Sequence, residues 1–310
     1  MTEASRYLAQ LSTEQLNASS SQLDTLTGEE IARLMNEQDA SVTAAVAHAV
    51  PVIGKVIDET AARMRRGGHL LYIGAGTSGR LGVLDASECP PTFGVAPSVV
   101  HGIIAGGDYA LRNAVEGAED HYDQGVLDVR EAGAGPLDVV VAISASGFAR
   151  YCAGALDEAR RAGALAVSMT CNVSSALSEH ADLAIEAPTG AEVLMGSTRL
   201  KAGTATKMML NMLSTGAMVR CGRVYKNLMV DLNVSNAKLE DRALRIIGHA
   251  TGAGADEALR LLREANGSVK TAIVLKLGGV SAARAKEALE ASGGWVHAAL
   301  GSLRSDAPSA

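Results

Sequence analysis

Residues 69–82 read HLLYIGAGTSGRLG, and this stretch decides the fold. Its first five residues form a short apolar run that leads directly into Gly74, as a buried β-strand does before a tight turn. The pattern Gly74-x-Gly76-x-x-Gly79 follows and opens a stretch of helical character. A glycine loop between a strand and a helix start offers unpaired backbone N–H groups, which bind phosphate. The stretch therefore predicts a strand, a phosphate-binding loop and a helix in succession.

Similar apolar runs recur at four later places: residues 99–104, 138–143, 165–169 and, more weakly, 183–185. Helical stretches lie between and after these runs, and we expect them at 109–131 (interrupted near Gly117), 148–161 and 200–220. Continuous Val- and Ile-rich runs that alternate with helices are typical of a parallel sheet covered on both faces. The expected fold class is α/β, a doubly wound parallel sheet flanked by helices.

The two ends of the chain read as helical rather than β. A polar arm precedes Thr27, which with Glu30 fits a capping box that opens a helix to Asn36. A second helix is expected over 42–66. After residue 235 the strand signal disappears, and five helices are expected at 237–249, 256–265, 269–277, 282–291 and 295–300. We therefore expect an N-terminal arm and helix (1–45), the sheet domain (46–235) and a C-terminal helical subdomain (236–310).

Composition limits the function classes. A chain of 310 residues with 47% hydrophobic and 20% charged residues is typical of a globular protein of one or two domains. Aromatic residues make up 3%, too few for base-stacking platforms. The net charge of −6 and the lack of a Lys/Arg run argue against nucleic-acid and membrane-surface partners.

Targeting and metal signals are equally sparse in the sequence. The polar N-terminus does not read as a signal peptide, and we recognise no apolar run of the ~18 residues that a membrane span needs, so a cytoplasmic protein is expected. The histidines form no metal-binding pair, and we expect neither a metal site nor a disulfide framework. The four cysteines lie far apart, without a C-x-x-C pair, at positions 89, 152, 171 and 221.

The glycine pattern alone is compatible with a dinucleotide site. Such sites usually carry an acidic residue about 20 residues further on, at the end of the next strand. Here Asp108 lies well beyond that spacing, and Arg80-Leu81 stands where a P-loop has Lys-Ser/Thr. Gly76 and Gly79 with the hydroxyls of Thr77 and Ser78 instead suit a single phosphate group.

A second loop of the same kind follows a later strand, where Ser144, Ser146 and Gly147 end the run at 138–143. Loops at the carboxyl ends of neighbouring parallel strands converge on one crevice. Two hydroxyl-rich loops there predict one small phosphorylated ligand, and N-capping of the next helix by Ser146 remains the alternative role.

Two carboxylates can overhang the same crevice. Glu88 lies in a proline-bounded segment after the first loop's helix, and Glu119 follows the second strand. A pair of carboxyl groups that faces one sugar can serve as general acid and general base. The sequence does not separate Glu119 from its neighbours Glu116 and Asp120.

Several blocks together carry a resemblance that extends from about residue 12 to about residue 300. They are GAGTSGRLG (74–82), DASECPPT (85–92), IAGG (104–107), EGAED (116–120), GAEVLMGSTRLKAGT (190–204), NMLSTG (211–216) and NLMVD (227–231). On these blocks the chain closely resembles the N-acetylmuramic acid 6-phosphate etherases, a bacterial family built on the sugar isomerase (SIS) domain.

The resemblance implies a SIS-type sheet and a reaction in which N-acetylmuramate 6-phosphate and water give N-acetylglucosamine 6-phosphate and D-lactate. It implies recycling of cell-wall amino sugar, no cofactor, and a homodimer with the sugar site near the subunit contact. By motif, Glu88 corresponds to the proton donor and Glu119 to the second catalytic carboxylate. The residues that correspond to the phosphate ligands are Thr77, Ser78, Ser144 and Ser146.

Two assignments come from chemistry rather than from the motifs. We expect Glu119 to remove the C2 proton of the ring-opened sugar while Glu88 protonates the departing lactate oxygen. Arg199 and Lys201 are the expected cations for the lactyl carboxylate, since Arg grips a carboxylate with two hydrogen bonds; a structural ion pair is the alternative role.

The chain departs from the family pattern after the second loop. Many members read Ser-Gly-Arg-Thr-Pro-Tyr where this chain has Ser146-Gly-Phe148-Ala149-Arg150-Tyr151, so we expect an altered loop shape or phosphate affinity. In the arm, Leu16 stands where an Arg is common.

Three other functions are compatible with a sugar-phosphate fold. A non-enzymatic regulator, similar to glucokinase regulatory proteins, would bind a sugar phosphate without forming product, although such proteins are longer. A sugar-phosphate isomerase would interconvert an aldose and a ketose. A nicotinamide dehydrogenase would bind its cofactor.

Overall fold

The computed structural model describes residues 7–232 and 237–305. The chain divides into two compact units, each of which is described by itself. The sheet unit comprises Met1–Ser87 and Pro97–Thr215, and the helical unit comprises Glu88–Ala96 and Gly216–Ala310.

The sheet unit contains five parallel strands in the order β2-β1-β3-β4-β5. The strands are β1 (Leu70–Gly74), β2 (Val100–Ile104), β3 (Val139–Ser144), β4 (Leu165–Thr170) and β5 (Leu183–Glu186). Every residue of β1 and β3 is buried, as the continuous apolar runs predict for strands covered on both faces. The expected doubly wound α/β fold is confirmed.

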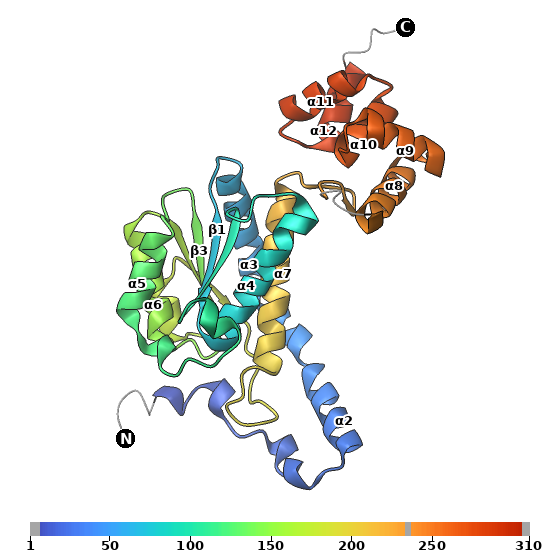
Figure 1. The fold of residues 1–310 in the computed structure, drawn as a ribbon. Coiled ribbons are helices and arrows are strands. Elements are labelled where there is room, and N and C mark those ends of the chain that lie inside the picture. The colour runs from blue at the N-terminus through green and yellow to red at the C-terminus, as the bar shows by residue number, and fades with distance from the viewer. Residues whose placement is uncertain (1–6, 233–236, 306–310) are drawn as a thin grey trace. The chain divides into compact units, whose positions relative to one another are not determined.

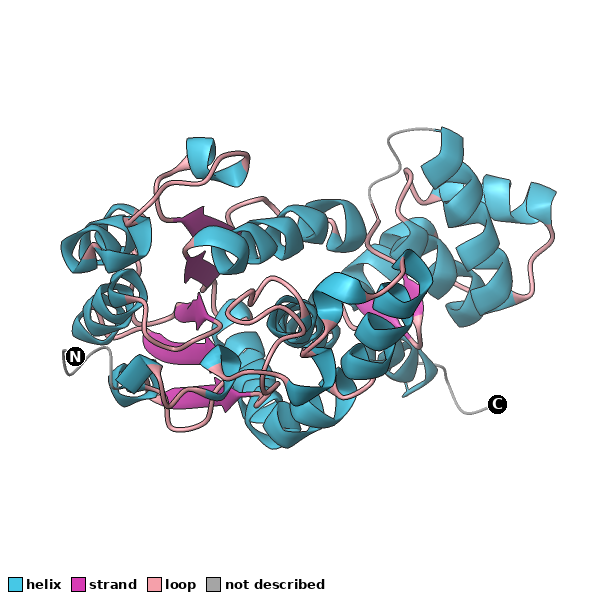
Figure 2. Ribbon diagram, turned by 90° about the horizontal axis from the view of Figure 1, so that it is seen from below, coloured by secondary structure: helices cyan, strands magenta, loops and turns pink. Residues whose placement is uncertain are grey.

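Helices lie on both sides of this sheet (Figures 1 and 2). One side carries α5 (Tyr122–Glu131) and α6 (Arg150–Arg161), and the other carries α3 (Val42–Met64), α4 (Gly76–Phe93) and the start of α7 (Lys201–Arg220). Side chains alternate between the two faces of a strand. Leu71 and Ile73 accordingly pack with Tyr151 and Leu156 of α6 in one core cluster.

The described part of the N-terminal arm includes three short 3-10 turns: η1 (Ser12–Glu14), η2 (Ala18–Ser20) and η3 (Leu23–Thr25). The expected capping box is confirmed: Glu30 N donates to Thr27 Oγ1 and Thr27 N to Glu30 Oε2 at the start of α2 (Gly28–Asp39). The sequence reading overlooked one apolar window, since the helical stretch Gly28–Met64 is long and apolar enough for a membrane span. One such stretch is weak evidence, because core helices share this composition, and α3 buries Val46, Ile53 and Val56.

Two elements differ from the sequence prediction. The sequence predicts an interrupted helix over residues 109–131, but only η4 (Asp108–Leu111), η5 (Ala118–Asp120) and α5 are helical. Gly117 has a φ of 72°, a left-handed conformation that stops any regular helix before η5. The second difference concerns Glu88, which lies within α4, because this helix continues through Pro90 and Pro91 to its end at Phe93.

The helical unit contains the five expected C-terminal helices. They are α8 (Ala237–Thr251), α9 (Ala255–Glu264), α10 (Val269–Gly278), α11 (Ala282–Ala291) and α12 (Val296–Ser305). Ile273 and Val274 of α10 are fully buried in their common core. A short hairpin of β6 (Val224–Tyr225) and β7 (Leu228–Met229), which the sequence reading missed, also contributes to this core.

Candidate active site

The order of the strands places a crevice between β1 and β3. From β1 the chain crosses through α4 to β2 on one side, whereas from β3 it crosses through α6 to β4 on the other. Loops that leave neighbouring strands in opposite directions open a binding crevice at the carboxyl ends of those strands. The two hydroxyl-rich loops predicted from sequence therefore meet at this point.

A cavity of about 130 Å³ lies between these loops, and we call it the phosphate cavity. The structure brings most of the predicted binding residues onto its wall. Its lining comprises Ala75, Gly76, Thr77, Ser78, Leu81, Glu119, Ile143, Ser144, Ala145, Ser146, Ala149, Thr198, Gly203 and Thr206.

The first loop presents the N-terminus of α4 to this cavity. Gly79 N donates to Ala75 O at 3.2 Å, so the N–H groups of Gly76, Thr77 and Ser78 precede the first bond of the helix. A Cβ on Gly79 would lie 2.5 Å from Gly74 O, which explains the glycine at this position. Gly79 thus supports the loop by close packing and does not line the cavity itself.

The second loop turns sharply at Gly147. This residue has a φ of 74°, and a Cβ on it would lie 2.3 Å from Ser175 Cβ, so no other residue fits without a shift. Gly147 N donates to Ser144 Oγ, and Phe148 N donates to Ser146 Oγ at 3.3 Å. The helix α6 starts later, at Arg150, without a side-chain cap. Ser146 therefore organises the loop and does not cap this helix.

A third wall of the phosphate cavity comes from Thr198, just before α7, and from Gly203 and Thr206 in the first turns of α7. The sequence reading missed Thr198 and Thr206, although Thr198 belongs to the block that carries the family resemblance. The N-terminus of α7 is itself closed, because the buried Glu192 carboxylate accepts hydrogen bonds from the backbone N–H groups of Lys201 and Ala202. Of the two helix starts, α4 is the one open to an anion.

Asn172 connects the N-terminal arm to the second loop. Its Oδ1 accepts a hydrogen bond from Ser12 N at 2.9 Å, and its Nδ2 donates to Thr13 Oγ1 at 3.0 Å. The same Nδ2 lies 3.3 Å from the carbonyl oxygens of Ala145 and Ser146, two residues that line the cavity. No sequence motif indicates this contact.

Glu119 lies on the boundary between the phosphate cavity and a second cavity of about 190 Å³. Desolvation raises the pKa of Glu119, and the negative charges of Asp120 and Glu116 raise it further. A carboxylate with a raised pKa is a better proton acceptor than an ordinary glutamate. The structure thus distinguishes Glu119 from Asp120, which lines neither cavity, and from Glu116, which lines only the second.

The lining of the second cavity includes one cation and two carboxylates. It consists of Ala75, Gly76, Arg80, Ala105, Ala110, Asn113, Ala114, Val115, Glu116, Gly117, Ala118 and Glu119. Arg80 is anchored there, because its Nε donates to Leu111 O at 3.1 Å and an Nη donates to Asn113 O at 2.9 Å.

Four predicted site residues line neither cavity, and Gly79 is one of them. Glu88 is exposed on α4, about 18 Å along the helix axis from Gly76 at 1.5 Å a residue. Arg199 is exposed, whereas Lys201 is buried at the start of α7.

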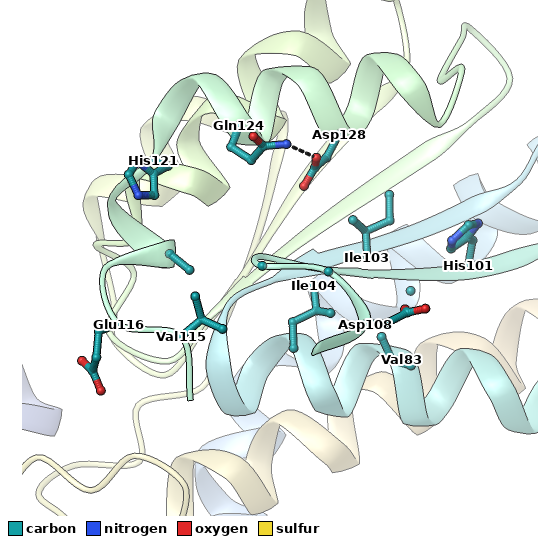
Figure 3. Close-up of a pocket in the computed structure, with 14 residues that line it drawn as sticks. Val83, His101, Ile103, Ile104, Asp108, Val115, Glu116, His121, Gln124 and Asp128 are labelled. Carbon is teal, nitrogen blue, oxygen red and sulfur yellow. Dashed lines mark hydrogen bonds between the residues drawn. The ribbon is translucent and has the colours of Figure 1, made fainter. Parts of the chain in front are cut away.

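A larger cavity lies elsewhere, along the edge strand β2, with a volume of about 600 Å³ (Figure 3). Val83 of α4 and His101 of β2 line it together with Gln124 and Asp128 of α5, which hydrogen-bond to each other at 2.6 Å. The hydroxyl groups of the two loops do not reach it.

The geometry suits acid–base chemistry on an anchored phosphate ester. Hydroxyl and backbone N–H groups surround one end of the crevice, and a basic carboxylate stands beside it. No group of three His, Cys, Asp or Glu residues suited to a metal ion occurs in the described parts of the chain.

Comparison with known proteins gives consistent matches. Residues 52–160 match the glucokinase regulatory protein N-terminal SIS domain, and residues 121–216 match the SIS domain. An N-acetylmuramic acid 6-phosphate etherase of Geobacillus thermodenitrificans is 50% identical over 94% of this chain and 99% of its own length. The etherase of the same name from Streptomyces avermitilis is 52% identical over 94% of each chain.

A solved structure of a protein from E. coli CFT073 has a TM-score of 0.46 and 16% identity. The match covers 63% of this chain and 93% of the E. coli chain.

Proposed function

Since the chain belongs to the family of N-acetylmuramic acid 6-phosphate etherases, we propose that it cleaves the D-lactyl ether of N-acetylmuramate 6-phosphate with water. The products are N-acetylglucosamine 6-phosphate and D-lactate, and the enzyme is a carbon–oxygen lyase. One observation supports this function above the others. A carboxylate with a raised pKa, that of Glu119, borders a cavity lined by Thr77, Ser78, Ser144 and Ser146.

The phosphate end of the substrate binds first in this proposal. The N-terminus of α4 and the four hydroxyl groups hold the phosphate dianion by charge-assisted hydrogen bonds. The anchored sugar then has its C2 and C3 atoms in reach of Glu119. Positioning of this kind turns a slow bimolecular proton transfer into an effectively intramolecular one.

The reaction proceeds by elimination and then addition. Ring opening gives an aldehyde at C1, which acidifies the proton on C2. Glu119 takes this proton, the C3–O bond breaks, and the departing lactate oxygen receives a proton from Glu88. Water then adds to C3 of the conjugated double bond, while Glu88 accepts a proton from that water and Glu119 returns one to C2.

We further propose a homodimer in which the subunits share their sites. Glu88 stands more than three helical turns from the phosphate-binding end of its own α4, so a second copy of the chain is the better source for this acid. A two-fold axis would place each Glu88 at the partner's crevice. The proposed location is the cytoplasm, where the enzyme would serve recycling of cell-wall amino sugar.

The decisive experiment measures D-lactate release from N-acetylmuramate 6-phosphate by the purified full chain. We expect release by the wild type and none by the Glu88→Ala variant with an unchanged circular dichroism spectrum. A folded wild type that binds the sugar phosphate and releases no lactate would instead support the regulator, to which residues 52–160 are also similar.

A further inference from the structure

The second cavity holds a positive charge that the steps above do not use. Arg80 lines this cavity, as Glu119 also does. Among the described residues that line the phosphate cavity and the second cavity, Arg80 is the one basic side chain. We propose that Arg80 binds the carboxylate of the lactyl substituent, an inference that rests on the proposed function.

The hydrogen bonds of Arg80 leave it able to bind an anion. Its Nε donates to Leu111 O and an Nη donates to Asn113 O. These use two of the five N–H donors of a guanidinium group, and both acceptors are neutral carbonyls. No carboxylate forms an ion pair with Arg80 across residues 7–232 and 237–305. The two bonds fix the plane of the group, so an arriving carboxylate meets donors that are already oriented.

The order of groups along the crevice corresponds to the order of groups in the substrate. The phosphate cavity and the second cavity share Ala75, Gly76 and Glu119 as lining residues. With the C6 phosphate in the first cavity, the reacting carbons C2 and C3 lie at the shared boundary. The lactyl group, which is attached to C3, then extends into the second cavity and toward Arg80.

Arg80 fits this role better than the two cations expected from sequence. Arg199 is exposed and lines neither cavity. Lys201 is only 4% exposed and lies at the N-terminus of α7, where its backbone N–H is held by Glu192. In contrast, Arg80 lines the same cavity as the proposed base, Glu119.

The two negatively charged neighbours in the cavity give the arginine a second effect. Glu116 and Glu119 lower the anion affinity of the cavity, so the lactyl carboxylate of the substrate would be repelled without Arg80. Once the C3–O bond breaks, the carboxylate belongs to free lactate, and the remaining sugar phosphate has no group for Arg80. Arg80 therefore distinguishes substrate from sugar product.

Binding to an inactive protein tests this inference without turnover. We would measure the affinity of N-acetylmuramate 6-phosphate and of N-acetylglucosamine 6-phosphate by calorimetry, using Glu119→Gln and Glu119→Gln/Arg80→Met. The second substitution should weaken binding of the muramate about ten- to hundredfold, as expected for a lost charged hydrogen-bond pair. Binding of the glucosamine, which lacks the carboxylate, should change less than about twofold.

Matched controls separate binding from folding. Arg112→Met removes a nearby exposed arginine that lines neither cavity, and it should leave both affinities unchanged. An equal loss for both sugars in the Arg80→Met protein would mean that Arg80 only shapes the loop, and would overturn the proposal. A selective loss in Arg199→Met, without one in Arg80→Met, would overturn it as well.

The outcome does not depend on the lactate assay. A wild type that releases no lactate would reject the etherase function, whereas the ratio of the two affinities would still decide whether Arg80 recognises the carboxylate.

Discussion

Asn172 Nδ2 lies 3.0 Å from Thr13 Oγ1, although 159 residues separate the two along the chain. Both residues are buried, and Asn172 also contacts the carbonyl oxygens of Ala145 and Ser146. The N-terminal arm is thus part of the support of the phosphate cavity. A substitution in the arm that removes this contact should accordingly alter the position of the second loop.

Loss of the Thr13 hydroxyl should lower both stability and phosphate affinity. Thr13→Val keeps the shape of the side chain but leaves the buried Asn172 amide without one acceptor, at a cost of about 1–3 kcal/mol in the free energy of unfolding. We expect a raised KM with little change in kcat, measured by urea unfolding and lactate release. Thr25→Val, in an exposed turn, serves as the control, and equal effects of both variants would contradict the role of the arm.

Mixing two inactive variants tests the shared site. If one subunit supplies Glu88 and the other supplies Glu119, a heterodimer of Glu88→Ala and Glu119→Ala chains retains one intact site. Random exchange of subunits should then restore about a quarter of wild-type activity, since half of the two-fold dimers are mixed. If each chain builds its own site, mixing restores nothing.

The pH dependence of kcat/KM should reflect the environment of Glu119. The carboxylate form is the base, so activity is lost as pH falls through the pKa of Glu119, and a raised pKa puts this loss above the ordinary value of 4.5. Glu116→Gln removes one of the negative charges that raise this pKa, and the acid limb should shift to lower pH. The same substitution at the exposed Glu131 is the control and should leave the limb in place.

Solvent hydrogen should enter the product at C2. Glu119 exchanges its proton with water between elimination and addition, so a reaction in D2O should give N-acetylglucosamine 6-phosphate with deuterium at C2. Mass spectrometry and proton NMR measure this incorporation. Retention of the original C2 proton would exclude the elimination route and leave direct displacement at C3.

Glu192→Gln should destabilise the start of α7. The Glu192 carboxylate accepts from the backbone N–H groups of Lys201 and Ala202 at 3.0 and 2.9 Å. An amide has one oxygen, so one of these buried N–H groups would face an NH2 group. We expect a loss of about 1–3 kcal/mol in the free energy of unfolding, measured in urea. Glu179→Gln, on an exposed residue of the same unit, should have no such effect.

The sheet could be predicted from sequence because its central strands, β1 and β3, are buried on both faces. A run such as Val139–Ser144 is short and almost entirely apolar, as a strand covered on both faces is, and a serine loop marks its end. The helix boundaries within residues 109–131 could not be predicted. They depend on the left-handed conformation of Gly117, with a φ of 72°, and the periodicity of the sequence does not indicate a backbone angle. Pro90 and Pro91 signalled a helix end that the structure places later, at Phe93.

The candidate site was predictable where the loop motif itself supplies the wall. Thr77, Ser78, Ser144 and Ser146 follow strands that the sequence identifies, and parallel strands bring their ends together. Thr206 lines the cavity and Asn172 supports its second loop, and tertiary packing alone brings them there from other elements. The division of the chain into 1–45, 46–235 and 236–310 stays a prediction, because a compact unit is not the same as a functional domain.

The order of synthesis separates the arm from its partner in time. Thr13 is translated before its partner Asn172, which follows 159 positions later. At a translation rate of about 5–20 residues a second, roughly 8–30 s pass between the synthesis of Thr13 and that of Asn172. Throughout that interval the hydroxyl of Thr13 lacks the amide partner that it has in the folded chain. The arm can therefore support the second loop only after Asn172 has been translated.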